Sequence, residues 1–367
     1  METPIQKQNK NEVPGKQSID VLIDGIYEKQ SPLCITIVPP TNREYWDQNQ
    51  ASWKIPHYQE LLAYNQEIIA QVAPIVPALA FDLNAYLSLG SEGMQALAES
   101  IQYAKTQGVS IMLNTNISPG DDETAQQLAK TFVSYPTNLQ QDSNQSQKSW
   151  TADFITITPY PSLKGVSAIA KVATEYKKGI FTTVLTEDTS ILNLQRSRVI
   201  PTALEQEAYF EMLGKETESI FLYERIALGN QRVEPKAYGT HGYTNIGAQI
   251  ALTTQEEMRT LRALMYDSYF LISDKTLPQT LKDQTKKAIL AEAFKDDGTG
   301  ALILMSSEIL VTPTATSQKE VPLPLTPANV NAINERLRQY HDSLTKGLEE
   351  HNKYPLQQEY RPLPHLW

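Results

Sequence analysis

Short runs of apolar and β-branched residues recur along the chain and alternate with segments whose apolar residues repeat at helical spacing. Such runs are typical of strands that are buried on both faces of a parallel sheet. Eight strands are predicted, at Leu33–Val38, Ala78–Leu83, Ser110–Thr115, Phe154–Tyr160, Gly179–Thr186, Thr244–Leu252, Tyr269–Ser273 and Ala301–Ser306. Eight alternating strands and helices within about 280 residues predict an α/β fold of the TIM (β/α)8 barrel type.

Further segments extend this barrel. The predicted organisation is a polar N-terminal extension at 1–30, the barrel at 31–311, a proline-rich connector at 312–326, a helix at 327–352 and an extended Pro/aromatic tail at 353–367. An insertion at 191–214 follows the fifth strand, and its QEAYFEML portion is predicted to be helical. The C-terminal helix begins with Pro327 in its first turn. One face of that helix is apolar and is expected to pack on the barrel through Val330, Ile333, Leu337, Tyr340, Leu344 and Leu348.

Composition and charge narrow the classes of function. The formal net charge of -10 argues against a nucleic-acid partner, which would need clustered Lys and Arg. The N-terminal sequence lacks the apolar core of a signal peptide and no long apolar run occurs, so a cytoplasmic protein without a transmembrane segment is expected. The five histidines are scattered and Cys34 lies in an apolar run, so no metal site is predicted and Cys34 is interpreted as a buried thiol.

The order of motifs resembles the orotidine 5'-monophosphate decarboxylase family, in particular its longer bacterial branch, from about Ser31 to Val311. The resemblance is carried by SPLCITIVPP, LAFDLNAYLSLGSEGMQALAESIQYAKTQGVSIMLN, DFITITPY, GIFTTVLTEDTSILNLQ, LYERIALGN, TNIGAQIALTTQEEMRTLRALM and DGTGALILMSSEILV. It implies a barrel that needs no cofactor, with its active site at the strand ends, and a homodimer in which the helix beginning near Thr124 contributes to the interface.

The same resemblance implies a catalytic Asp-x-Lys-x-x-Asp motif at the end of the third strand, followed by a threonine. Here Asn114 stands at the first aspartate and Asn116 at the lysine, and an amide cannot serve as a general acid. Asp121 or Asp122 could replace the last aspartate, but their spacing to Thr124 differs from the family pattern. The alternative interpretation is that the two aspartates form an acidic first turn of a helix, which is the favoured one.

Positions that bind the nucleotide in the family also differ. Val38 stands where the first strand carries a ribose-binding aspartate, and Val76 stands where a Lys-Pro pair is usual. Lys275 lies on the loop expected to hold phosphate, and Glu308 stands at the phosphate-binding arginine. The carboxylate of Glu308 would repel a phosphate dianion. Lys275 could nevertheless provide the positive charge for an anion site. A solvated loop lysine is the simpler interpretation of Lys275.

These differences predict a catalytically inactive homologue that acts as a protein-binding, scaffold or regulatory subunit. The tail offers the residues for a protein partner, because aromatic anchors in proline-rich segments are favoured in interfaces. Its predicted partner-binding residues are Tyr354, Tyr360, Leu363, Leu366 and Trp367, and packing of the tail on its own barrel is the alternative. Peripheral docking on a larger complex is also left open. Two other functions compete: an enzyme with altered, lyase-like chemistry on the same face, and a sensor that binds a small molecule without turnover.

Overall fold

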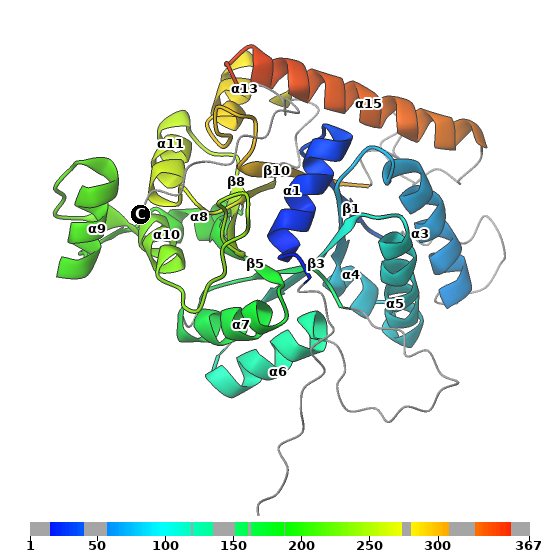
Figure 1. Ribbon diagram of the computed structural model, residues 1–367, viewed down its shortest axis with the longest axis horizontal. Helices are drawn as coiled ribbons and strands as arrows, with labels where there is room; N and C mark the ends of the chain where they lie inside the picture. Colours follow the sequence, from blue (N-terminus) through cyan, green and yellow to red (C-terminus); the bar gives the residue numbers. More distant parts are fainter. Residues whose placement is uncertain are drawn as a thin grey trace, which may run out of the picture.

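A closed barrel of eight parallel strands forms the centre of the molecule (Figure 1). The computed structural model describes residues 15–39, 57–118, 120–134, 151–160, 163–186, 188–273, 280–307 and 327–353. Around the barrel the strands follow the order β1 (Leu33–Ile37), β10 (Ala301–Ser306), β9 (Phe270–Ser273), β8 (Ile246–Ala251), β5 (Gly179–Leu185), β4 (Phe154–Ile157), β3 (Ser110–Ile117) and β2 (Ala78–Asp82). The eight predicted strands and the TIM barrel are therefore confirmed.

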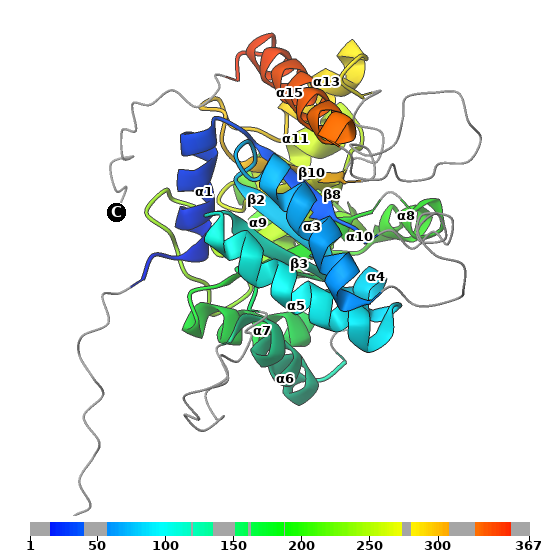
Figure 2. The same cartoon turned by 90° about the vertical axis from the view of Figure 1, so that its right-hand side faces the viewer.

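Helices cover the outer face of the barrel in both views (Figures 1 and 2). They are α3 (Tyr58–Val72), α4 (Leu83–Leu87), α5 (Gly90–Thr106), α6 (Asp122–Val133), α7 (Leu163–Glu175), α10 (Leu222–Gln231), α11 (Gln255–Leu264) and α13 (Gln284–Ala291). The insertion after β5 contains α8 (Thr189–Gln195), β6 (Arg198–Val199), α9 (Ala203–Leu213) and β7 (Ile220–Phe221). The predicted helix within QEAYFEML is thus part of α9.

The N-terminal extension was predicted incorrectly from residue 18 onward, because Ser18–Lys29 forms the helix α1. Its buried side chains Ile19, Leu22, Ile23 and Ile26 belong to the core cluster at the N-terminal ends of the strands. Their spacing places them on one helical face, which closes that end of the barrel. The polar composition of the preceding residues concealed this short amphipathic helix. Residues 1–14 lie outside the described part of the chain.

Large and small residues alternate inside the barrel. The rings of Phe154 on β4 and Phe181 on β5 lie 5.4 Å apart, and both side chains are buried. Each ring occupies the space beside a glycine on the next strand, Gly179 for Phe154 and Gly247 for Phe181. Cys34 is buried in the same cluster, and burial raises the pKa of its thiol, so the predicted structural role of this cysteine agrees with its position.

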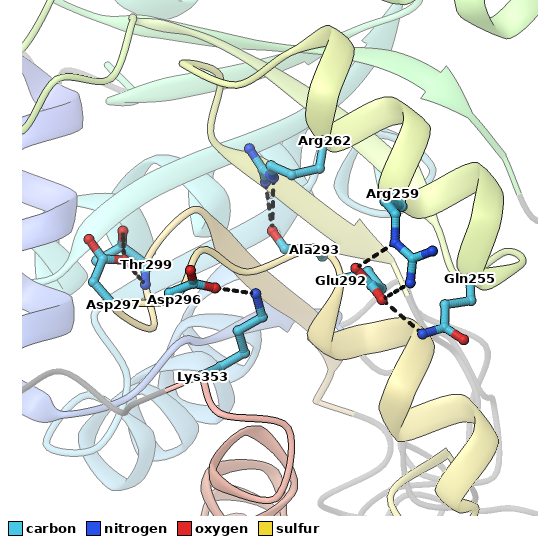
Figure 3. Close-up of polar contacts among 9 residues, drawn as sticks. All are labelled: Gln255, Arg259, Arg262, Glu292, Ala293, Asp296, Asp297, Thr299 and Lys353. Atoms are coloured by element: carbon cyan, nitrogen blue, oxygen red, sulfur yellow. Dashed lines mark hydrogen bonds and ion pairs between the residues drawn. The ribbon is translucent and has the colours of Figure 1, made fainter. Parts of the chain in front are cut away.

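The C-terminal helix α15 (Pro327–Glu349) begins at the predicted residue and packs against α3 and α13. Four side chains of the predicted face are buried and Tyr340 is partly buried, the four being Ile333, Leu337, Leu344 and Leu348. Just beyond the helix, Lys353 Nζ donates to Asp296 Oδ1 at 2.8 Å (Figure 3). The helix is therefore held to the barrel by an apolar face and by an ion pair at its C-terminal end.

Two arginines of α11 connect that helix to the segment around α13 (Figure 3). Arg259 Nη2 lies 2.6 Å from Glu292 Oε1, on the surface. Arg262 is buried and has no carboxylate partner among the described residues; its guanidinium donates to the carbonyl oxygens of Met265, Ser268, Ala293 and Gly300. Because a buried cation is costly unless its donors are satisfied, these carbonyls fix the chain around Arg262.

No helix within the described ranges is long and apolar enough to cross a membrane. The predicted proline-rich connector, the tail beyond Lys353 and the polar segment at 135–150 lie outside the described residues.

The packing of Phe181 predicts a strong effect of Gly247→Ala. The added Cβ would lie 2.5 Å from the Phe181 ring and 2.8 Å from the Tyr269 carbonyl oxygen. We expect the free energy of unfolding in urea to fall by about 1–3 kcal/mol, the usual cost of overpacking. Gly120→Ala is the matched control, because its Cβ would meet nothing within 4 Å. Equal effects of the two substitutions would contradict this account of the barrel interior.

Candidate functional site

A cavity of about 950 Å³ opens at the C-terminal ends of the barrel strands. It is lined by Asp82, Asn114, Asn116, Thr158, Tyr160, Thr183, Leu185, Thr186, Asp188, Ile191, Leu194, Gln195, Gln249, Ala251 and Ser273. Asp82, Leu185, Ala251 and Ser273 are the last residues of β2, β5, β8 and β9. The cavity thus lies at the end of the barrel opposite α1, where TIM barrels carry their active sites.

The lining mixes polar and apolar side chains and carries no positive charge among the described residues. Amides and hydroxyls predominate, and the ionisable acids are the carboxylates Asp82 and Asp188. No Lys, Arg or His belongs to the described lining. The interior of the barrel therefore changes along its axis, from the apolar cluster beside α1 to a layer of neutral hydrogen-bonding groups at the mouth.

The end of β3 is organised by the buried hydroxyl of Thr156 on β4. Thr156 Oγ1 donates to Asn114 Oδ1 at 2.6 Å and accepts from the N–H groups of Thr115 and Asn116 at 3.1 and 3.3 Å. Asn116 has a φ of 48°, in the left-handed region that asparagine tolerates better than most residues. The β3–β4 pairing shifts register between Leu113 and Ile117. This bulge and its hydroxyl partner position both asparagines at the cavity.

A second neutral pair crosses from β5 to β8. Thr183 Oγ1 donates to Gln249 Oε1 at 3.2 Å. The side-chain oxygens of two lining amides, Asn114 and Gln249, thus accept from threonine hydroxyls of the barrel. Within the described part of the chain, no acceptor is found for Asn114 Nδ2 or Gln249 Nε2. Both amides therefore present N–H donors to the cavity wall.

The two lining carboxylates each cap a short helix. Asp82 Oδ1 accepts from the N–H groups of Asn84 and Ala85 at 3.0 and 3.2 Å, at the start of α4. Asp188 Oδ1 accepts from Ser190 N at 2.9 Å, at the start of α8. These two carboxylates lie at the cavity rim.

One wall of the cavity comes from α8 in the insertion. The buried Gln195 fixes that helix, since its Oε1 accepts from Thr186 N at 3.0 Å and its Nε2 donates to Val184 O at 3.3 Å. Ile191 and Leu194 contribute exposed apolar side chains to this wall. Nearby, burial raises the pKa of the Tyr160 hydroxyl, which keeps it protonated and able to donate. The cavity thus has a polar floor and a partly apolar side.

The residues predicted for catalysis separate into two groups. Asn114 and Asn116 lie at the cavity, as their place at the end of the third strand predicts. Asp121 and Thr124 lie outside its lining, where Asp121 Oδ1 and Oδ2 accept from Thr124 N and Oγ1 at 2.9 and 2.8 Å. Asp121 is the N-cap of α6, and Asp122 is exposed in its first turn. This arrangement corresponds to the helix-cap interpretation.

The positions predicted from the resemblance to bind the nucleotide do not contribute to the described cavity lining. Val38 follows β1, and its N–H donates to Ser307 Oγ at 3.2 Å, but it is not part of the cavity lining. Val76 is buried before β2, at the barrel end opposite the cavity, so it does not contribute to the lining. A residue that precedes a strand cannot line the face where the strand ends, and the β2 residue that lines the cavity is Asp82. Lys275 and Glu308 lie outside the described residues.

Several lining residues were not predicted, among them Asp82, Thr183, Gln195, Gln249 and Ser273. Four of them are polar residues within apolar strands. Period-two alternation would have assigned Thr183 and Gln249 to the inner face near the strand ends. No sequence pattern indicates Gln195 as a lining residue, because its role depends on the tertiary position of α8.

The predicted tail residues Tyr354, Tyr360, Leu363, Leu366 and Trp367 lie outside the described part of the chain. The described residues contain no group of three or more His, Cys, Asp or Glu side chains suited to a metal ion. His241 lies at the opposite end of the barrel, where its Nε2 is 2.9 Å from Asp24 Oδ1 of α1.

Comparison with known proteins gives a consistent family relationship. The chain is 23% identical over 257 residues to an orotidine 5'-phosphate decarboxylase of Petrotoga mobilis, covering 69% of this chain and 77% of the relative. It is 23% identical over 286 residues to that of Clostridium perfringens strain 13, covering 77% and 85%. A putative orotidine 5'-phosphate decarboxylase structure from Streptomyces avermitilis aligns with a TM-score of 0.62 at 14% identity, over 94% of this chain and 100% of that one. No family model matches the chain.

The central place of Thr156 predicts that Thr156→Val destabilises the fold. Valine has nearly the same shape but removes the donor to Asn114 and the acceptor for two backbone N–H groups. We expect a loss of about 1–3 kcal/mol in the free energy of unfolding, the range for stranded buried polar groups. Urea denaturation measures it. Thr158→Val is the control, since the described residues give its hydroxyl no partner; a similar loss there would argue against a special role for Thr156.

The cap at Asp121 predicts a pH dependence. Hydrogen bonds from Thr124 lower the pKa of the Asp121 carboxyl. A lowered folded-state pKa means that the stabilisation is present above the ordinary carboxyl pKa and is lost as the pH falls through the lowered value. The difference in melting temperature between wild type and Asp121→Ala should therefore be largest near neutral pH and shrink in acid. Asp121→Asn should retain part of the cap without titrating. A pH-independent difference for Asp121→Ala would contradict this assignment.

Proposed function

We propose that this chain, a divergent homologue of the orotidine 5'-phosphate decarboxylases, does not decarboxylate orotidine monophosphate and instead binds an uncharged, hydroxyl-rich small molecule at its barrel mouth. The observation that carries the proposal is the composition of the cavity lining. Within its described part, amides and hydroxyls surround two carboxylates without a cation. Sugars and polyols are the ligand class that these groups match.

The lack of decarboxylation follows from the end of β3. Asn114 and Asn116 contact the cavity where the family resemblance leads us to expect an aspartate and a lysine. An amide holds its protons far too tightly to act as a general acid, and loss of a general acid typically costs about 10² to 10⁴ in rate. Thr156 also engages Asn114 through its oxygen, so the network at this strand end is neutral throughout.

A phosphorylated ligand is disfavoured by electrostatics. Phosphate recognition relies on Arg, Lys or converging backbone N–H groups. The described lining offers no Arg or Lys, and the carboxylates of Asp82 and Asp188 would repel a dianion. A neutral ligand avoids this repulsion. Its hydroxyls could donate to the carboxylates and accept from the amide N–H groups of Asn114 and Gln249.

Altered catalysis is the weaker alternative in this geometry. Asp121 and Asp122, two acids that such chemistry could use, lie outside the cavity lining. Ligand binding without turnover requires only the groups that do line the cavity. A regulatory or scaffold role is compatible with it, since ligand binding could control a protein contact; homodimer formation through α6 stays a prediction.

The first test is turnover of orotidine monophosphate by the purified chain. We expect no loss of substrate absorbance under conditions in which the Clostridium perfringens relative consumes it completely. Decarboxylation that Asn116→Ala abolishes would overturn the proposal.

The second test compares neutral sugars and polyols with their phosphate monoesters in thermal unfolding. A neutral ligand present at ten times its Kd should stabilise the chain by about 1.4 kcal/mol, and the monoester should not. Gln249→Leu should abolish the shift, because it removes a lining amide. Leu87→Ser, an exposed substitution on α4 outside the lining, should leave the shift unchanged. Stabilisation by phosphate monoesters alone would contradict the assigned ligand class.

A further inference from the structure

Exposed apolar side chains are concentrated in the insertion after β5. Of the ten large hydrophobic side chains that are exposed in the described residues, six lie between Ile191 and Met212. Ile191 and Leu194 face the cavity, but Ile200, Leu204, Phe210 and Met212 do not belong to its lining. The exposed fractions of Ile200, Leu204 and Phe210 are 82%, 60% and 52%. Single exposed apolar residues are ordinary, whereas such a cluster indicates an interaction surface.

The helix α9 projects from the barrel, as its position at the edge of Figure 1 shows. None of its residues is fully buried. Ala208, Tyr209 and Leu213 face the protein core from one side of the helix. Leu204 and Phe210 lie away from that side, and helical geometry places Glu207 and Glu211 between them. The outer face of α9 is thus an apolar surface interrupted by two carboxylates.

This surface is held in place rather than loosely attached. Arg225 Nη2 lies 3.0 Å from Glu205 Oε2, which links α10 to α9. Arg196 Nη2 lies 2.8 Å from Glu257 Oε2, which fixes the beginning of the insertion to α11. Thr202 and Glu205 form a capping box at the first turn of α9. A surface fixed in advance loses less entropy when it binds a partner.

The negative charge of the surface is only partly balanced, because Arg232 Nη2 donates to the Leu204 carbonyl oxygen at the first turn of α9. Glu205 is paired with Arg225, but the described residues provide no ion pair for Glu207, Glu211, Glu216 or Glu218. Lys215 is the nearest lysine in sequence, at the end of α9. Uncompensated carboxylates beside exposed apolar side chains favour an occupant that supplies both apolar contacts and positive charge.

We infer that the outer face of α9 binds a cationic amphipathic segment of a partner protein, with apolar side chains against Leu204 and Phe210 and lysines or arginines against Glu207 and Glu211. A second copy of this chain fits less well, because a symmetric contact centred on α9 would place these carboxylates against each other. Anionic membranes and nucleic acids are opposed by the same charge. The surface is separate from the cavity, so the inference stands independently of the proposed ligand.

The inference is tested with the full chain and two labelled synthetic helical peptides. One peptide carries leucines on one face and lysines beside them; the other has glutamate at each lysine position. By fluorescence anisotropy we expect one-to-one, saturable binding of the lysine peptide and none of the glutamate peptide. Zero-length carbodiimide cross-linking should join peptide lysines to Glu207 or Glu211.

Two variants identify the surface. Leu204→Ser combined with Phe210→Ser should weaken binding of the lysine peptide at least tenfold, and Glu207→Lys with Glu211→Lys should abolish it. Val21→Ser on α1, which is 46% exposed at the other end of the barrel, is the matched control and should bind as wild type does. Equal loss in that control, cross-links confined to other carboxylates, or self-association that the Leu204/Phe210 variant abolishes in sedimentation would each overturn the inference. The last result would assign the face to a second copy.

Discussion

Closure of the barrel is the constraint on which the rest of the structure depends. β1 pairs with β10 on one side and with β2 on the other, so that every barrel strand has two parallel neighbours. With all strands running in the same direction, their C-terminal residues meet at one mouth and their N-terminal residues at the other end. Closure therefore brings Asp82, Asn114 and Gln249 to one cavity although they are far apart in the sequence.

The two ends of the barrel are stabilised in different ways, by apolar packing at one end and by hydrogen bonds at the other. At the N-terminal end, α1 and the rings of Phe154 and Phe181 fill the interior, with Gly179 and Gly247 providing the space. At the mouth, threonine hydroxyls hold the amide oxygens of Asn114 and Gln249. A neutral network of this kind can be partly buried at a much lower desolvation cost than a network of charges. It keeps the strand ends ordered while presenting hydrogen-bond donors.

The insertion after β5 connects the cavity to the outer surface. Its first helix, α8, forms a wall of the cavity and is fixed by Gln195. Its second helix, α9, carries exposed apolar side chains that are not part of the cavity lining. The pair formed by Arg196, at the C-terminal end of α8, and Glu257 joins α8 to α11. A small molecule bound at the cavity and a partner bound at α9 would therefore both contact the insertion after β5.

The sequence by itself determined the eight strands, the start of α15 and its buried face, and the place of Asn114 and Asn116, because these follow from local periodicity and from motif order. The tertiary structure decided which residues share the mouth. Val76 lies before β2 whereas Asp82 lines the mouth, because strand direction, which a local motif match ignores, determines the face on which a residue lies. The tertiary structure also decided three other features: the hydrogen bond between Thr156 and Asn114, the position of Gln195, and the closure of one barrel end by α1. Each joins segments distant in sequence, and such contacts are set by barrel closure rather than by neighbouring residues.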